Sequence, residues 1–189
     1  MGINNRKDGF EVAPLSIKQI QMASDATREF AKQLGFVKES GCIDIVGLVE
    51  LGNLDVACGD KNSQLELSVV PDELLPKAEA KTYPNGVIEI RESVYNSATS
   101  NDPRSRFTLA HELFHALAHC SQITYCRNTS SNTKIYCNSE WQADTFAGNL
   151  LLPDELIERY KALDEQSLSS MLGVSVACIK VRKKKYYSN

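Results

Sequence analysis

The sequence has few of the features that mark membrane, secreted or fibrous proteins. No stretch of its 189 residues approaches the ~20 apolar residues that span a bilayer, and the opening segment, MGINNRKDGFE, has no apolar run typical of a signal peptide. There are only ten glycines and six prolines, and no tract is of low complexity, which argues against a collagen-like or disordered chain. We therefore expect a globular protein of the cytoplasm.

Neither sign of charge is in large excess. With 21 Lys and Arg against 24 Asp and Glu, the net charge is -3, which predicts no general attraction to nucleic acid. The last ten residues hold five of the basic residues, so the C-terminus carries +5 and residues 1–179 carry 16 minus 24, or -8. The six cysteines are expected to be thiols, because a chain of this length without an export signal does not need disulfides.

Apolar periodicity and end signals predict an α+β fold that is mainly helical and has a small sheet. Helices are predicted over residues 17–34, 45–51, 103–119, 139–151, 154–163 and from 167 onward. Strands are predicted over residues 55–58, 65–69 and 87–90, the second from the alternation of apolar and polar residues that ends at Val69. Ser139 and Gln142 match a capping box, and the polar segment 120–138 before them is predicted to be a loop.

All three histidines of the protein lie in the predicted helix 103–119. His111 and His115 are one turn apart, ~6 Å along the helix axis and on the same face, so their imidazoles can converge on one metal ion. With Glu112 they form the HExxH pattern, in which two histidines bind zinc and the glutamate is the general base for a zinc-bound water. His119 lies ~12 Å along the axis from His111, so we expect it to be structural or to orient a ligand.

A third protein ligand must be a carboxylate or a thiolate, because the chain has no further histidine. The predicted helix 139–151 supplies two carboxylates, Glu140 and Asp144, four residues apart on one face. One of them can bind zinc while the other orients a ligand histidine through its free ring N–H. An acidic residue in a first helical turn also interacts with the helix dipole, so Glu140 alone would not establish a site.

Two segments together resemble the signatures of the ImmA/IrrE family of metallopeptidases. They are RSRFTLAHELFHALAH and SEWQADTFAGNLLLP, the second of which follows the family pattern E-x-x-A-N/D-x-F-A-x-x-L-L-x-P. The resemblance implies a zincin-like minimal metallopeptidase domain with a small twisted sheet. It also implies one Zn²⁺ per chain held by His111, His115 and Glu140, with Glu112 as the base and Asp144 orienting a histidine.

The resemblance further implies a protein substrate, either a helix-turn-helix transcriptional repressor or an antitoxin-like partner. Its cleavage would relieve repression of stress, phage or mobile-element genes. We expect the peptidase domain over residues 1–163 and a helical, helix-turn-helix-like extension over 164–189, packed on the same domain, with Gly173 in the turn. No membrane partner is expected.

Two details bear on how a substrate would be held. Phe114 stands where the family motif commonly has glycine, and we expect it to pack in the core rather than to narrow the cleft. The strand 87–90 is expected either at the rim of the cleft, where it would pair with an extended substrate, or within the core.

Peptide hydrolysis also needs a donor for the oxyanion besides the metal. Tyr125, Tyr136 and Arg106 are the candidates, and the sequence does not choose among them. A second, structural zinc site is disfavoured, because its potential ligands match no compact spacing pattern. Those residues are His119, Cys120, Cys126 and Cys137.

Two functions of other classes compete with proteolysis. The first is a non-catalytic zincin-fold module that binds and sequesters a regulator or toxin. The second is a DNA-binding regulator that acts through its basic C-terminus, which we consider the less favoured role of that helix because neither a dimer interface nor a complete motif is visible. Neither accounts for a complete ligand set together with a base.

Overall fold

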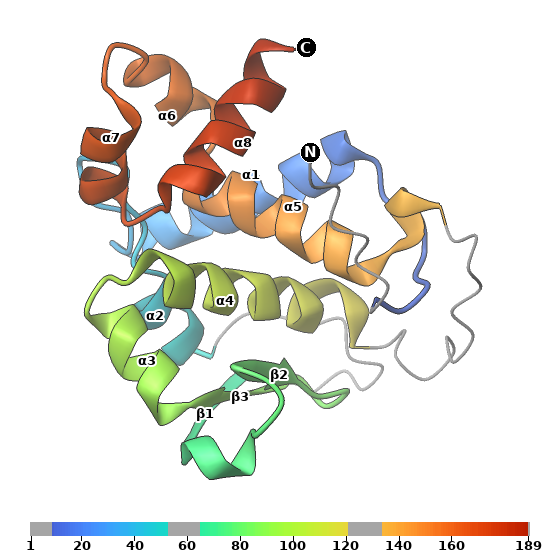
Figure 1. Ribbon diagram of the computed structural model, residues 1–189. Coiled ribbons are helices and arrows are strands. Elements are labelled where there is room, and N and C mark those ends of the chain that lie inside the picture. The colour runs from blue at the N-terminus through green and yellow to red at the C-terminus, as the bar shows by residue number, and fades with distance from the viewer. Residues whose placement is uncertain (1–8, 53–64, 121–133, 189) are drawn as a thin grey trace.

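The structure is a computed structural model that describes residues 9–52, 65–120 and 134–188. It is mostly helical with a small three-stranded mixed sheet, as the sequence predicts. Figure 1 shows α4 between the sheet on one side and α1 and α5 on the other. The helices are α1 (Ile17–Gln33), α2 (Ile45–Glu50), α3 (Glu92–Thr99), α4 (Pro103–Phe114), α5 (Ser139–Leu151), α6 (Asp154–Arg159), α7 (Glu165–Leu172) and α8 (Val176–Tyr187).

The first two helices begin where their capping residues predict. Ser16 and Gln19 form a reciprocal capping box at the start of α1, so two backbone N–H groups that lack helical partners are satisfied by side chains. Asp44 accepts a hydrogen bond from the backbone N–H of Gly47 at the start of α2. Both predicted helices are confirmed to within a residue or two.

The sheet has the order β1-β3-β2, with β1 (Glu66–Val70) parallel to β3 (Val87–Arg91) and β2 (Ala80–Thr82) antiparallel to it. The predicted strands near 65–69 and 87–90 are confirmed, whereas β2 and α3 were not predicted. Val69 of β1 is exposed, although it belongs to the alternation that predicted the strand. The predicted strand 55–58 lies outside the described residues.

The core lies between α4 and α5 and extends to α1, α2 and the sheet. Phe114 is 2% exposed, and its ring stacks on Phe146 of α5 with 4.6 Å between centroids. The expectation that Phe114 packs in the core is therefore confirmed. This contact fixes the spacing of the two helices that carry the candidate ligands.

The C-terminal helices pack on the rest of the molecule. Gly173 ends α7 in the left-handed conformation (φ 62°), and Ser175 caps α8, as predicted for a helix–turn–helix-like segment. Arg182 of α8 is 8% exposed and donates to the backbone carbonyl of Leu152 and to Asp154. At least one charge of the basic helix is thus engaged inside the protein. None of the helices described here is long and apolar enough to cross a membrane.

Candidate metal centre

The helix α4, which carries His111 and leads directly into the turn with His115, begins at a defined cap. Asp102 caps α4 by accepting from the backbone N–H of Ser105, and Pro103 occupies the first helical position, where its missing N–H costs nothing. The following turn, His115–His119, is a π-helix, a widening often found at functional sites. The helix therefore reaches His119 as predicted, but its last turn is not α-helical.

The N-cap of helix α5 lies one residue earlier than the sequence predicts. Asn138 is the N-cap, with its side-chain oxygen 2.9 Å from the backbone nitrogen of Trp141. Ser139 instead accepts from the backbone N–H of Phe10 at 3.0 Å. The predicted Ser139–Gln142 capping box is therefore wrong. The Gln142 side chain, fully buried, turns into the molecule.

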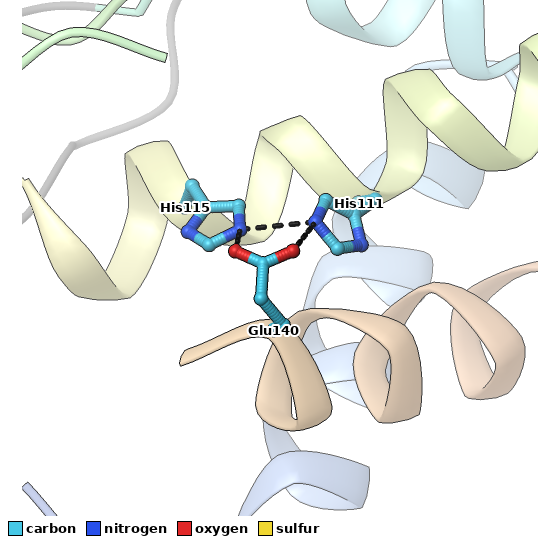
Figure 2. A group of neighbouring side chains, drawn as sticks. All are labelled: His111, His115 and Glu140. Atoms are coloured by element: carbon cyan, nitrogen blue, oxygen red, sulfur yellow. Dashed lines mark hydrogen bonds and ion pairs between the residues drawn. The ribbon is translucent and has the colours of Figure 1, made fainter. Parts of the chain in front are cut away.

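Three ligand atoms converge between α4 and α5, as Figure 2 shows. The Nε2 atoms of His111 and His115 are 3.0 Å apart. The Glu140 carboxylate spans both rings, with Oε2 3.2 Å from Nε2 of His111 and Oε1 3.3 Å from Nε2 of His115. Among the residues that the structure describes, this is the one cluster of three or more potential metal ligands. Cys126, a potential ligand of the disfavoured second zinc site, lies outside the described residues.

The protonation pattern of this cluster fits a cation. Nδ1 of His111 lies 3.0 Å from Oδ1 of Asp144, and because a carboxylate only accepts, Nδ1 carries a proton, so that the neutral ring presents the lone pair of Nε2. That lone pair faces another acceptor, the carboxylate of Glu140. Ligand atoms of a tetrahedral zinc site, with bonds of about 2.0–2.1 Å, lie about 3.3 Å apart, so the observed spacing suits such an ion.

Glu140 is held in its charged form. Burial by itself raises the pKa of its carboxyl, but where no cation is bound and the Nε2 atoms of His111 and His115 carry protons, the hydrogen bonds and charges of these rings outweigh burial and bring the pKa well below its usual range. A bound cation would take the place of those protons. The carboxylate is only 28% exposed. An ionised, partly buried carboxylate that lies between two imidazoles is the kind of oxygen ligand that zinc binds in proteins.

Glu112 faces a cleft beside this cluster and is fixed by a residue that sequence reasoning missed. The Thr82 hydroxyl of β2 lies 2.7 Å from Oε2 of Glu112 and 3.1 Å from its backbone carbonyl. The cleft, about 520 Å³ in volume, is lined by residues 76–80, Arg91 and the exposed face of α4. No local signal marks Thr82, because β2 has only three residues and its contact with α4 is tertiary.

His119 is buried behind the cluster and is not one of the converging ligands. Its Nδ1 lies 3.0 Å from Nδ1 of His115, and its Nε2 lies 2.9 Å from Oε1 of Gln142. Burial, and next the neighbouring His115, lower the pKa of His119 to about 4, so its ring is neutral near pH 7. The sequence predicted a capping role for Gln142, and its contact with His119 was not expected.

The structure describes two of the three oxyanion candidates, Arg106 and Tyr136. Arg106 lies on the opposite side of α4, where its buried guanidinium donates to the backbone carbonyls of Ile43 and Gly173. Tyr136 is exposed, with the Lys134 ammonium 5.8 Å from its ring centroid. Tyr125 lies outside the described residues. The geometry thus gives Arg106 a structural contact and leaves the two tyrosines as candidates.

The fold and the cluster define a class of protein. A helix carrying HExxH, a glutamate from the next helix that meets its two histidines, and a short sheet beside Glu112 form a metallopeptidase domain with a candidate metal site. The family comparison agrees: residues 73–184, more than half of the chain, match the model of peptidase family M78, the IrrE N-terminal-like domain. The chain belongs to this ImmA/IrrE family. No curated protein and no solved structure matches it.

Proposed function

We propose that the chain is a zinc-dependent endopeptidase whose site is built from α4, α5 and β2. The observation that carries this proposal is the convergence of His111, His115 and Glu140 on one point, with Glu112 beside it on the wall of a cleft. A zinc ion bound there would act as a Lewis acid, lowering the pKa of its water toward neutrality and polarising the peptide carbonyl.

The protein groups divide the remaining work. Glu112 takes the proton of the attacking water and returns it to the leaving amine. The Thr82 hydroxyl fixes Oε2 of Glu112, so that the carboxylate faces the water with a defined rotamer. Asp144 keeps the proton of His111 on Nδ1 and its lone pair on Nε2.

The edge strand β2 offers a place for an extended substrate. Of the two alternatives for strand 87–90, the rim of the cleft or the core, its central place and its buried Ile88 and Ile90 favour the core. That strand, β3, is central and pairs with both neighbours. Glu79 and Tyr83 form backbone hydrogen bonds with β3, so by antiparallel alternation the backbone groups of Ala80 and Thr82 point away from it. No strand of the described residues covers that edge, which borders the cleft. A peptide could pair there beside Glu112.

The substrate that we propose is a helix-turn-helix transcriptional repressor or an antitoxin-like protein in the cytoplasm. Its cleavage would relieve repression of stress, phage or mobile-element genes. This part of the proposal rests on the resemblance to ImmA/IrrE peptidases. An open cleft bordered by a strand edge suits a flexible, extended segment of such a protein better than a folded domain.

Metal content and cleavage, measured on three proteins, test the proposal. Wild type is expected to hold about one zinc per chain, Glu140→Ala to lose it, and Glu112→Gln to keep it while losing cleavage of a candidate repressor by at least about 100-fold. A wild type that binds no zinc when supplied would contradict the site. A Glu112→Gln protein that still relieves repression would instead favour the sequestering module.

A further inference from the structure

The second ring nitrogen of His115 begins a chain of hydrogen bonds that ends on the backbone of two other segments. His115 contacts His119, and His119 contacts the carboxamide oxygen of Gln142. The amide nitrogen of Gln142 lies 2.9 Å from the carbonyl of Ala13 and 2.8 Å from the carbonyl of Tyr136. All three side chains are at most 8% exposed.

The far end of this chain determines the position of every proton in it. Backbone carbonyls only accept, so the NH₂ group of Gln142 faces Ala13 and Tyr136, and its oxygen faces His119. Nε2 of His119 must therefore donate to that oxygen. In the neutral ring Nδ1 of His119 is then an acceptor, and Nδ1 of His115 must donate to it. Nε2 of His115 is left with a lone pair directed at Glu140 and His111.

We infer that His119 and Gln142 are positioning residues that set the tautomer and ring orientation of His115 for metal binding. A neutral relay thus performs for His115 what the Asp144 carboxylate performs for His111. The relay ends on the carbonyl of Ala13 before α1 and on that of Tyr136 before α5. The N-terminal segment therefore contributes to a metal ligand without contacting the metal.

The relay requires that the predicted capping box does not form. A Gln142 side chain that capped α5 would have its amide at the helix start and would leave the Nε2–H of His119 without its acceptor. Asn138 caps the helix instead, and Gln142 is free to face inward. The capping of α5 by Asn138 thus leaves Gln142 available to orient His115 through His119.

Zinc affinity, measured by competition with a chromophoric chelator, is the first test, and it rests on the proposed function. His119→Phe keeps a ring of similar size but leaves the Nδ1–H of His115 unpaired, so the dissociation constant for zinc should rise about 10- to 100-fold. His119→Asn places a side-chain oxygen near the former Nδ1 and should recover part of this loss. Gln142→Met should have an intermediate effect, because it frees the tautomer of His119 without removing the ring.

Asn149→Ala is the matched control, because Asn149 is buried on the same helix α5 and lies outside the relay. It should leave zinc affinity unchanged even if it lowers the melting temperature. Equal losses of affinity in Asn149→Ala and His119→Phe would overturn the relay in favour of a general packing effect.

The tautomer itself is tested by NMR of wild-type protein labelled with nitrogen-15 histidine, which carries only three histidines. With and without zinc, His119 should show a protonated Nε2 and an unprotonated Nδ1. A proton on Nδ1 of His119, or averaging between the two tautomers, would overturn the inference. The spectrum of the metal-free protein already tests the tautomer of His119. A wild type that binds no zinc would therefore contradict the proposed function, and this spectrum would still support or overturn the relay.

Discussion

Thr82 illustrates how a single residue can fix the geometry of the site without binding metal. Its hydroxyl is within hydrogen-bond distance of both the Glu112 carboxylate and the backbone carbonyl of the same residue. A hydroxyl has one proton to donate, and the charged carboxylate, at the shorter distance, is its stronger acceptor. The side chain of Glu112 is thus tied to the edge strand rather than left to rotate in the cleft.

Removing this hydroxyl should slow turnover without affecting the metal. Thr82→Val keeps the size and branching of the side chain but loses a hydrogen bond to a charged group, and we expect kcat to fall about 10-fold with KM and zinc content nearly unchanged. Steady-state kinetics on the cleaved substrate, with zinc analysis alongside, is the measurement. Thr82→Ser should restore most of kcat, and a failure to do so would point to packing rather than to the hydroxyl.

Helix ends and turns determine how the elements of this protein meet. The turn between α7 and α8 contains Gly173, whose φ of +62° disfavours any side chain. A Cβ at this position would lie 2.6 Å from Oδ1 of Asn101 and 2.8 Å from Nε of Arg106. Arg106 donates to the carbonyl of Gly173, so the turn and α4 are packed directly together.

Gly173→Ala should therefore lower the free energy of unfolding by more than backbone strain alone. Gly35 is the matched control: it also has a positive φ, +82°, but nothing lies within 4 Å of its Cβ position. We expect about 1 kcal/mol of destabilisation for Gly35→Ala and about 2–3 kcal/mol for Gly173→Ala, from strain plus the displaced Arg106 contact. Urea denaturation of both variants measures this, and equal losses would show that the close approach to Arg106 contributes nothing.

For the whole molecule, the candidate metal site joins two helices that are separate in the sequence. His111 comes from α4, His115 from the π-helical turn that continues α4, and Glu140 from α5. The helices α4 and α5 also contact each other through Phe114 and Phe146. An ion bound by all three ligands favours the folded state only, so it adds to stability by mass action. The fold and the proposed cofactor are therefore coupled.

Removing zinc should lower the melting temperature of wild type but not of Glu140→Ala. At free zinc about 100 times the dissociation constant, binding adds about 2.7 kcal/mol. For a chain of this size that corresponds to roughly 5–10 °C. Thermal unfolding with and without a chelator measures the shift, and a shift of the same size in Glu140→Ala would contradict binding at this cluster.

The sequence by itself determined the features that depend on local spacing. The one-turn separation of His111 and His115, the two carboxylates at 140 and 144, and most helix boundaries follow from a period of 3.6 residues and from capping side chains. The family pattern likewise lies within two continuous segments. These are properties of residues near one another in the chain.

Only the tertiary structure decided which distant groups meet. Thr82 contacts Glu112 across 30 positions, and Gln142 contacts His119 instead of capping α5, because a buried amide is more stable when its polar atoms have hydrogen-bond partners. Arg106, a plausible oxyanion donor in sequence, is held instead by backbone carbonyls on the far side of α4. Such contacts depend on packing between elements, which local propensity and spacing do not encode.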